Sequence, residues 1–527
     1  MTRRTWTLVA VVLASGIVFL DSTVVNVALD HIGKELPATY VASLEGQSYV
    51  VFGYLLTLSA LLILAGAMAD VYGRRRMFLI GLTGFGIMSV LCGIAPNMEL
   101  LIVSRLIQGA FGALLVPTSL AIISATFEGE ERGRAFGIWA AASGATTLLG
   151  PPLGGFLVDA ISWRVVFLIN VPLVLVALYA GLAHVAESRN PEARGRFDWL
   201  GAIVVALGVG GLSFGAIRGQ QQQWADPLAW IALAVGAIAT VAVVPLMLRR
   251  SAPLIPPFLF RSRNFTVTNI STLLIYGALY VFSYLSAIFV QGTLAYSALA
   301  AGLVGLPISI LLTIFSTKIG SLAGRYGPRW FMTIGPALMA VGLLWLTRLP
   351  AGSEAWDASL ADPVSLVPPG AYWIDIFPSV LVFAVGLTIM VAPLTTALMN
   401  SVPERNSGIA SAINNAISRV GPLLAGAVIF VAITGAFYGG MQARVPSMNV
   451  DDPAIRRDIS PLNQPADTVS AAEARAANEA STDAFHLAML IAALLCAAGA
   501  AVNGIGIRNA STASSVEAAP AAAGGDA

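Results

Sequence analysis

Asp21, Arg105 and Gln108 are polar residues that interrupt long apolar stretches of this sequence. Asp21 lies in the stretch 6–29, and the other two lie in the stretch 99–124. A charged side chain inside a membrane span costs roughly 2.5–3.5 kcal/mol on insertion scales, so such residues tend to be functional. A carboxylate can bind and release a proton, whereas arginine stays charged at every accessible pH. The residue types therefore predict a proton carrier, Asp21, that Arg105 alternately pairs and releases.

Helical spacing places these residues near one another. At 1.5 Å per residue, Asp21 lies about 5 Å to the outer side of the middle of its stretch, and Gln108 lies at a similar depth. Arg105, Gln108, Gly109 and Gly112 stand at positions i, i+3, i+4 and i+7, so they share one helix face. We expect that face to line a cavity. The alternatives are an Asp21 hydrated near the membrane interface and an Arg105 that extends outward to the head groups.

A second charged group lies in the string GAMADVYGRRR, Gly66 to Arg76. Asp70 falls at the end of the second apolar stretch, where the dipole of a helix disfavours negative charge. Arg74, Arg75 or Arg76, or the N-terminus of a neighbouring helix, would offset this cost. A related string, GSLAGRYGPR, Gly320 to Arg329, follows the tenth apolar stretch.

Other polar residues within the stretches could line a cavity or tie helices together, and the sequence does not separate these roles. They are Asn26, Asn170, Asn269, Gln291, Asn400, Asn414 and Asn415. We predict that the cavity is lined by Asn26, Gln108, Gly109, Gly112, Asn414 and Asn415. Arg419, about three turns into the thirteenth stretch, either reaches the cytoplasm or contacts the cavity.

The elements that position these residues are membrane spans. Apolar residues make up 57% of the 527 residues and charged residues only 11%, which excludes an ordinary soluble protein. The net charge of +1 gives no support for a nucleic-acid partner. Only helices satisfy their backbone polar groups within one apolar segment, so we expect an all-α polytopic membrane protein. Fourteen stretches are long enough to span a bilayer: 6–29, 47–68, 76–95, 99–124, 134–158, 163–186, 199–217, 227–248, 265–291, 297–317, 330–348, 373–399, 408–437 and 484–507.

Basic residues predict the orientation of the chain. The termini and the loops on their side hold 19 Arg and Lys residues, and the opposite loops hold 8. By the positive-inside rule, both termini are expected in the cytoplasm, with the chain crossing the plasma (inner) membrane many times.

The two related strings predict an internal repeat. Each follows the second helix of a six-helix set if the stretches 199–217 and 227–248 are an insertion. Two homologous halves could rock against each other around a site at the middle of the membrane. The expected division is an N-terminal six-helix bundle, two inserted helices with a cytoplasmic linker, a C-terminal six-helix bundle with a long external loop, and a disordered cytoplasmic tail. The ranges are 1–186, 187–264, 265–508 with the loop 440–483, and 509–527.

Seven motifs in order resemble the major facilitator superfamily, in particular its fourteen-helix drug:proton antiporter (EmrB/QacA) branch. The similarity extends from about residue 15 to 435. The motifs are LDSTVVNVAL from Leu20, the string from Gly66, RLIQGAFGA from Arg105, GPPLGG from Gly150, WRVVFLINVP from Trp163, FDWLG from Phe197 and ERNSGIASAINNAISRVG from Glu404.

The resemblance implies a major facilitator fold and a proton-coupled exporter of small, amphipathic or hydrophobic compounds, as in multidrug or antibiotic efflux. It implies that the string from Gly66 is a cytoplasmic latch for the outward-facing state and that GPPLGG belongs to exporters. The expected gating residues are Gly66, Asp70, Gly73, Arg74, Arg75, Gly150, Pro151, Gly154 and Gly155. We expect a monomer that handles a small molecule and protons in the lipid bilayer, with no cofactor, metal or catalytic residue; the sequence does not determine whether an adaptor or outer-membrane partner exists.

Other classes of membrane protein fit less well. A P-loop needs a Gly-Lys-Ser/Thr sequence, but Lys34 and Lys318 are followed by Glu35 and Ile319. The histidines are isolated, which argues against a metalloenzyme, and no repeated pore loop or charged ring indicates a channel. An importer or uniporter of a metabolite and a sensor with the same fold remain open.

Overall fold

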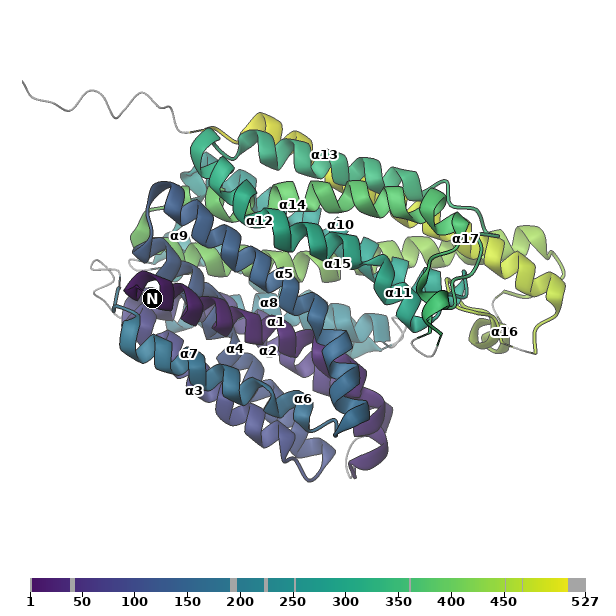
Figure 1. Cartoon of the computed structure of the whole chain (residues 1–527), viewed down its shortest axis with the longest axis horizontal. Helices are drawn as coiled ribbons and strands as arrows, with labels where there is room; N and C mark the ends of the chain where they lie inside the picture. Colours follow the sequence, from purple (N-terminus) through teal and green to yellow (C-terminus); the bar gives the residue numbers. More distant parts are fainter. Residues whose placement is uncertain are drawn as a thin grey trace, which may run out of the picture.

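The computed structural model describes residues 2–37, 43–189, 197–221, 226–250, 253–359, 362–450, 452–466 and 468–509. Within these ranges the regular structure is helical, apart from one isolated β-bridge between Ser359 and Asp362. Figure 1 shows long helices that run side by side, with α3 and α7 at one edge and α13 at the opposite edge. The predicted all-α polytopic fold is confirmed.

The N-terminal helices occupy the first six predicted stretches. They are α1 (Arg3–Glu35), α2 (Ser43–Tyr72), α3 (Arg74–Gly93), α4 (Met98–Thr126), α5 (Gly129–Ala160), α6 (Val165–Leu168) and α7 (Asn170–His184). The sixth stretch is divided at Ile169 into the short α6 and α7. A hydrophobic core formed mainly by these helices includes Tyr54, Phe78, Phe85 and Phe136, all of which are fully buried.

The insertion and the C-terminal helices follow. They are α8 (Trp199–Gln221), α9 (Pro227–Arg249), α10 (Arg263–Gly292), α11 (Ala298–Val304), α12 (Leu306–Tyr326), α13 (Arg329–Leu346), α14 (Phe377–Asn400), α15 (Ser407–Arg444), α16 (Pro453–Asp458) and α17 (Ala471–Gly506), with short turns η1 (Pro257–Arg261), η2 (Pro363–Leu366), η3 (Tyr372–Ile376) and η4 (Glu404–Asn406). A second core is built from α10 to α17 and includes Phe289, Phe383 and Phe437.

Thirteen helical segments in the described ranges are long and apolar enough to cross a membrane. They match thirteen of the fourteen predicted stretches. The helix at the fifth stretch, α5, has 32 residues but is not among the thirteen. Its many Gly, Pro, Ser and Thr residues lower its hydropathy, although its length and position match the prediction.

The inserted helices pack on the outside of the molecule. α8 contacts its partner α9 as well as α2 and α15. At the connection of α8 to α9, Arg218 donates to Asp226 at 2.5 Å and to the Tyr49 hydroxyl of α2 at 2.9 Å. Hydrogen bonds from the Leu228 backbone N–H and from Arg218 lower the pKa of the Asp226 carboxyl. The insertion is therefore attached to an N-terminal helix at this end.

The last predicted span is longer than its apolar part. A capping box joins Ser470 and Glu473 and begins α17, so the polar segment near 470–480 is continuous with the span. Arg444 at the end of α15 contacts Glu479 at 3.1 Å and Asp483 at 2.6 Å, which joins the extended ends of the two helices. Of the predicted tail 509–527, only Asn509 lies within the described residues; it accepts from the Arg329 N–H at 3.2 Å.

Candidate functional site

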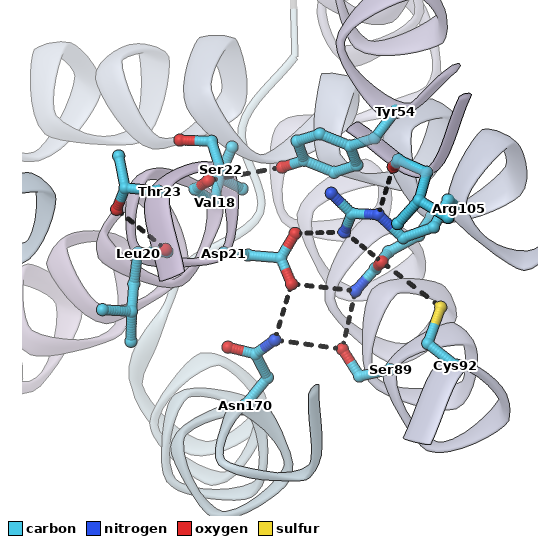
Figure 2. A network of polar contacts seen from close by, with 12 residues as sticks. Val18, Leu20, Asp21, Ser22, Thr23, Tyr54, Ser89, Cys92, Arg105 and Asn170 are labelled. Carbon is cyan, nitrogen blue, oxygen red and sulfur yellow. Dashed lines mark hydrogen bonds and ion pairs between the residues drawn. The ribbon is translucent and has the colours of Figure 1, made fainter. Parts of the chain in front are cut away.

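A buried ion pair lies among the N-terminal helices. The Nη1 atom of Arg105 in α4 donates to Oδ2 of Asp21 in α1 at 2.5 Å, and the two side chains are 1% and 0% exposed. Figure 2 shows the carboxylate at the centre of a polar network. The sequence placed both residues in apolar stretches, and the fold brings them into direct contact.

Two amides share the other oxygen of Asp21. Oδ1 accepts from the Asn170 Nδ2 of α7 at 2.9 Å and from the Gln108 Nε2 of α4 at 3.4 Å. Both amides also donate to the Ser89 hydroxyl of α3, at 3.3 and 2.8 Å. Side chains from α1, α3, α4 and α7 thus surround one carboxylate and satisfy it, as a buried charge requires.

The guanidinium of Arg105 has several partners besides Asp21. Its Nε donates to the Val50 carbonyl of α2 at 2.9 Å, and Nη1 donates to Gln108 Oε1 at 2.8 Å. The Arg105 guanidinium carbon lies 4.1 Å from the centre of the Tyr54 ring, at cation–π distance. Arg105 therefore stays inside the bundle and does not extend to the head groups.

Local structure sets these positions. Asn97 caps the N-terminus of α4 by accepting from the Leu100 N–H at 2.9 Å, which fixes the start of the helix two turns before Arg105. Asn170 is the first residue of α7, directly after the break at Ile169. Gln108 is fully buried and belongs to the Asp21 network.

Three other residues predicted to line a cavity, Gly109, Gly112 and Asn414, contact a neighbouring helix in this conformer. A Cβ on Gly109 would clash with α2 at Tyr54 and Thr57, and Gly112 faces Leu58. Asn414 of α15 donates to Asn269 Oδ1 at 3.1 Å and to Thr272 Oγ1 at 2.8 Å, both in α10. Asn415 donates to the Ser411 carbonyl of its own helix. The side chain of Asn26 lies outside the described residues.

Asp70 lies at the contact between α2 and α15. Its Oδ1 accepts from Arg74 at 3.2 Å, and its Oδ2 accepts from the backbone N–H of Ile409, in the first turn of α15, at 2.9 Å. Arg74 also donates to the Glu404 carbonyl at 2.5 Å. Asp70 and Arg74 are 4% and 1% exposed. An arginine and the N-terminus of another helix together offset the unfavourable position of Asp70 at the end of α2.

Gly73 and Arg75 form a separate contact within the N-terminal helices. Gly73 has a φ of +109°, and a Cβ there would lie 2.8 Å from the Glu187 carboxylate. Glu187 accepts from the backbone N–H groups of Arg75 and Arg76 at 3.0 and 3.1 Å and so caps α3. Arg75 donates to the Leu182 carbonyl at 2.6 Å. These contacts fix the connection between α2 and α3 to the end of α7.

Glycines bring the N-terminal and C-terminal helices close together near Asp70. A Cβ on Gly66 would clash with Gly408 and Ala412 of α15. Between α5 and α12, a Cβ on Gly133 would lie 2.7 Å from the Gly320 carbonyl, and one on Gly137 would lie 2.7 Å from the Thr317 backbone. The two sets of helices are therefore tightly packed at the end that carries Asp70.

The glycines of GPPLGG bring α5 against α1. A Cβ on Gly150 would clash with Thr23, and one on Gly154 would lie 2.8 Å from the Val24 carbonyl. Gly155 is half-buried, and the side chain of Pro151 lies outside the described residues. The motif thus positions α5 next to the turn of α1 that follows Asp21.

Sequence reasoning missed several partners of the site. Ser89 and Tyr54 are single polar groups in apolar helices, and nothing in their spacing relates them to Asp21. Glu187 lies just after the sixth apolar stretch, and nothing in the sequence relates it to Gly73 or Arg75. Asn170 was among the polar residues whose role stayed open. In the described part of the chain, no group of three or more His, Cys, Asp and Glu side chains could hold a metal ion.

Comparisons with known proteins agree with this fold. The family model for the Major Facilitator Superfamily matches residues 11–426. The chain is 34% identical over 424 residues to the multidrug resistance protein Stp of Mycobacterium tuberculosis, covering 80% of this chain and 74% of Stp. It is 30% identical over 434 residues to the tetracenomycin C resistance and export protein of Streptomyces glaucescens, covering 81% and 76%.

A solved structure shows the same architecture. The proton:xylose symporter XylE, bound to a glucose derivative, aligns with a TM-score of 0.55 over 93% of this chain and 94% of that structure. The sequence identity is 16%, so this likeness bears on the fold alone.

Proposed function

Because the chain belongs to the major facilitator superfamily, we propose that it is a proton-coupled transporter that exports small, amphipathic or hydrophobic compounds by alternating access. Its similarity to proteins named for multidrug resistance and antibiotic export supports the direction and the class of compound. The observation that carries the proposal is the buried pair of Asp21 and Arg105.

Proton coupling follows from the way Asp21 is held. In this conformer Arg105, Asn170 and Gln108 all donate to the carboxylate, so three side chains from two other helices are positioned by it. A proton arriving at Asp21 removes the charge that holds Arg105 and changes the contacts between α1, α4 and α7. Proton uptake and helix rearrangement therefore depend on each other, which is the linkage that an antiporter needs.

Alternating access requires two bodies and a contact that opens. We take α1–α7 and α10–α17 as the two bodies, because each set has its own hydrophobic core. The contact of Asp70 and Arg74 with α15 must separate when this end opens. The excess of Arg and Lys on this side supports a cytoplasmic location for the Asp70 contact and for both termini. The protein would then lie in the plasma membrane. In the conformer described, the end that carries Asp70 is closed.

A susceptibility screen identifies the compound class, and vesicle transport tests the mechanism. An efflux-deficient host that expresses this chain should become less sensitive to exported compounds. Everted vesicles should accumulate such a compound when an inward-acid pH gradient is imposed. Accumulation in the opposite direction would favour the importer, and no accumulation of any compound that binds would favour the sensor.

A further inference from the structure

Arg419 is an arginine near the middle of a membrane-spanning helix. It lies 12 residues after Ser407, the first residue of α15, which corresponds to about 18 Å along the helix axis. The hydrocarbon core is about 30 Å thick, so a side chain at this depth is far from both interfaces. The residue is half-buried.

Arg419 has no hydrogen bond or ion pair with any residue that the structure describes. The phenol of Tyr54 in α2 is the titratable group close enough to interact with it electrostatically. By contrast, Arg105, another arginine within a membrane-spanning helix, contacts a carboxylate, an amide and a carbonyl. An arginine in the membrane interior is costly, so an arginine without a protein partner indicates a ligand or pathway that supplies one.

The position of Arg419 on α15 places it between the two bodies. Gly408, Ala412, Asn415 and Arg419 stand at i, i+4, i+7 and i+11 and share one helix face. Gly408 and Ala412 pack against α2 at the closed end. Arg419 follows on the same face at the level of Tyr54, whose ring contacts Arg105 on the other side. The unpaired charge therefore adjoins the coupling network.

An aromatic groove continues along the same face. Tyr280 and Tyr284 of α10 stack with ring centres 5.6 Å apart and an angle of 5° between their planes. With Gly426 and Phe430 of α15 they line a pocket, together with Val281, Leu285 and Ile429. Gly426 and Phe430 are seven and eleven residues beyond Arg419, about 10 and 16 Å along the helix. A single compound of drug size could contact both the charge and the aromatic rings.

The charges of the described residues determine the sign of the ligand. Asp21 is paired with Arg105, and Asp70 is paired with Arg74, so neither carboxylate is free for a cationic ligand. The guanidinium of Arg419 is the complementary group for an anion, and its planar fork matches a carboxylate in particular. The stacked tyrosines and Phe430 favour a planar aromatic ring.

We propose that Arg419 and the groove of Tyr280, Tyr284 and Phe430 form a binding site for aromatic acids, with the acid group on Arg419 and the rings in the groove. That the bound acid is a transport substrate rests on the proposed export function. The existence of the binding site does not rest on it.

Equilibrium binding to the full chain tests this site. The protein is placed in nanodiscs of zwitterionic phosphatidylcholine. The probes are 4-(1-pyrenyl)butyrate, in which a three-carbon linker separates the acid group from the rings, and its uncharged methyl ester, followed by their fluorescence. The wild type should bind the acid at least tenfold more tightly than the ester, and Arg419→Gln should remove this preference. Arg419→Lys should keep part of it. Phe430→Leu should weaken both probes by similar factors.

The matched control is Arg444→Gln, the same change on the same helix, at an arginine that is already paired with Glu479 and Asp483. It should keep the wild-type preference. Equal binding of acid and ester by the wild type, or an unchanged preference in Arg419→Gln, would overturn the proposal. If Arg419→Gln does not fold, the proposal is tested by the ratio of acid to ester affinity in the wild type and in Arg419→Lys. A full wild-type preference for the acid in Arg419→Lys counts against the site.

Two further measurements separate a lipid site from a site for aromatic acids, and binding from transport. Adding phosphatidylglycerol should leave acid binding unchanged; displacement of the acid would assign the site to a lipid phosphate and overturn the proposal. A wild type that prefers the acid but shows no pH-driven transport of any compound would refute the export function and leave the binding site intact. A wild type that shows pH-driven transport but binds acid and ester equally would refute the binding site and leave the export function intact.

Discussion

At the scale of single residues, Asp21 and Arg105 were recognisable because charge inside an apolar stretch is rare and expensive. Helix geometry then put Gln108 at the same depth, and the structure places all three in one network. Ser89 could not be found this way, since a serine hydroxyl inside a helix can satisfy itself locally and leaves no pattern. Tyr54 could not be found either, because its hydroxyl donates to the Val18 carbonyl of α1 and its ring contacts Arg105 only once the helices have packed. Their roles depend on which helices become neighbours, and that is a property of the fold.

Arg105→Lys should impair coupling without abolishing it. A lysine can place a charge near Asp21, but it cannot reproduce the planar fork that also reaches Val50 and Gln108. A buried acceptor left unsatisfied costs about 1–3 kcal/mol, so the melting temperature should also fall. The initial rate of pH-driven uptake should lie between those of the wild type and Asp21→Asn. Arg444→Lys, at a more exposed pair, is the control and should behave as the wild type; an Arg105→Lys rate equal to wild type would contradict this role.

At the scale of elements, the apolar stretches predicted helix positions well because a membrane span must be apolar along most of its length. Helix ends were less predictable. α17 begins 13 residues before its predicted start, since its first turns are polar and stabilised by the Ser470 capping box and by Arg444. The break at Ile169, which puts Asn170 at the start of α7, had no clear signal either.

Asp70→Asn should slow turnover more than it weakens substrate binding. Asp70 lies at the helix ends, where it contacts Arg74 and the first turn of α15. Because this contact joins the two bodies, Asp70 affects the equilibrium between conformers. Binding affinity in nanodiscs and uptake rate in vesicles should be measured on the same preparations. Glu187→Gln is the matched control, because Glu187 caps α3 within one body and should affect stability only. Equal losses of affinity and rate, at normal expression, would indicate a direct ligand contact or misfolding.

The inserted pair α8 and α9 should lie outside the transport pathway. Only 17% of the most apolar part of α9 is buried, and α8 lies between α9 and the helices α2 and α15. Ser213→Ala in α8 and Pro245→Ala in α9 should therefore change substrate affinity by less than tenfold, about 1.4 kcal/mol. A larger loss in a variant with a wild-type melting temperature would place the insertion at the substrate.

At the scale of the whole molecule, the orientation in the membrane is predicted from the distribution of basic residues, because the fold itself does not reveal the orientation. Single cysteines at Ser470 and Ser514 test it in whole cells, after replacement of the two native cysteines, which are buried and free. The Ser470 cysteine should react with an impermeant thiol reagent from outside, and the Ser514 cysteine should not. Labelling in the reverse pattern would invert the topology and would put the Asp70 contact on the external side.

The proposed exchange of protons for substrate is also a property of the whole molecule, because it would require the network around Asp21 and the contact around Asp70 to change together. Asp21→Asn keeps the size of the side chain while removing its charge, and its amide oxygen can still accept hydrogen bonds at one of the two positions. It leaves Arg105 without its anion, so folding must be confirmed by melting temperature and by binding of an uncharged substrate.

The most direct test of the coupling role of Asp21 is pH-driven uptake into everted vesicles that contain Asp21→Asn protein. We expect no response to an imposed pH gradient, although binding of an uncharged substrate remains measurable. Uptake at the wild-type rate would contradict the assignment of Asp21 as the coupling carboxylate. It would direct attention to Asp30, directly after the first apolar stretch, and to Asp375, near the start of the twelfth.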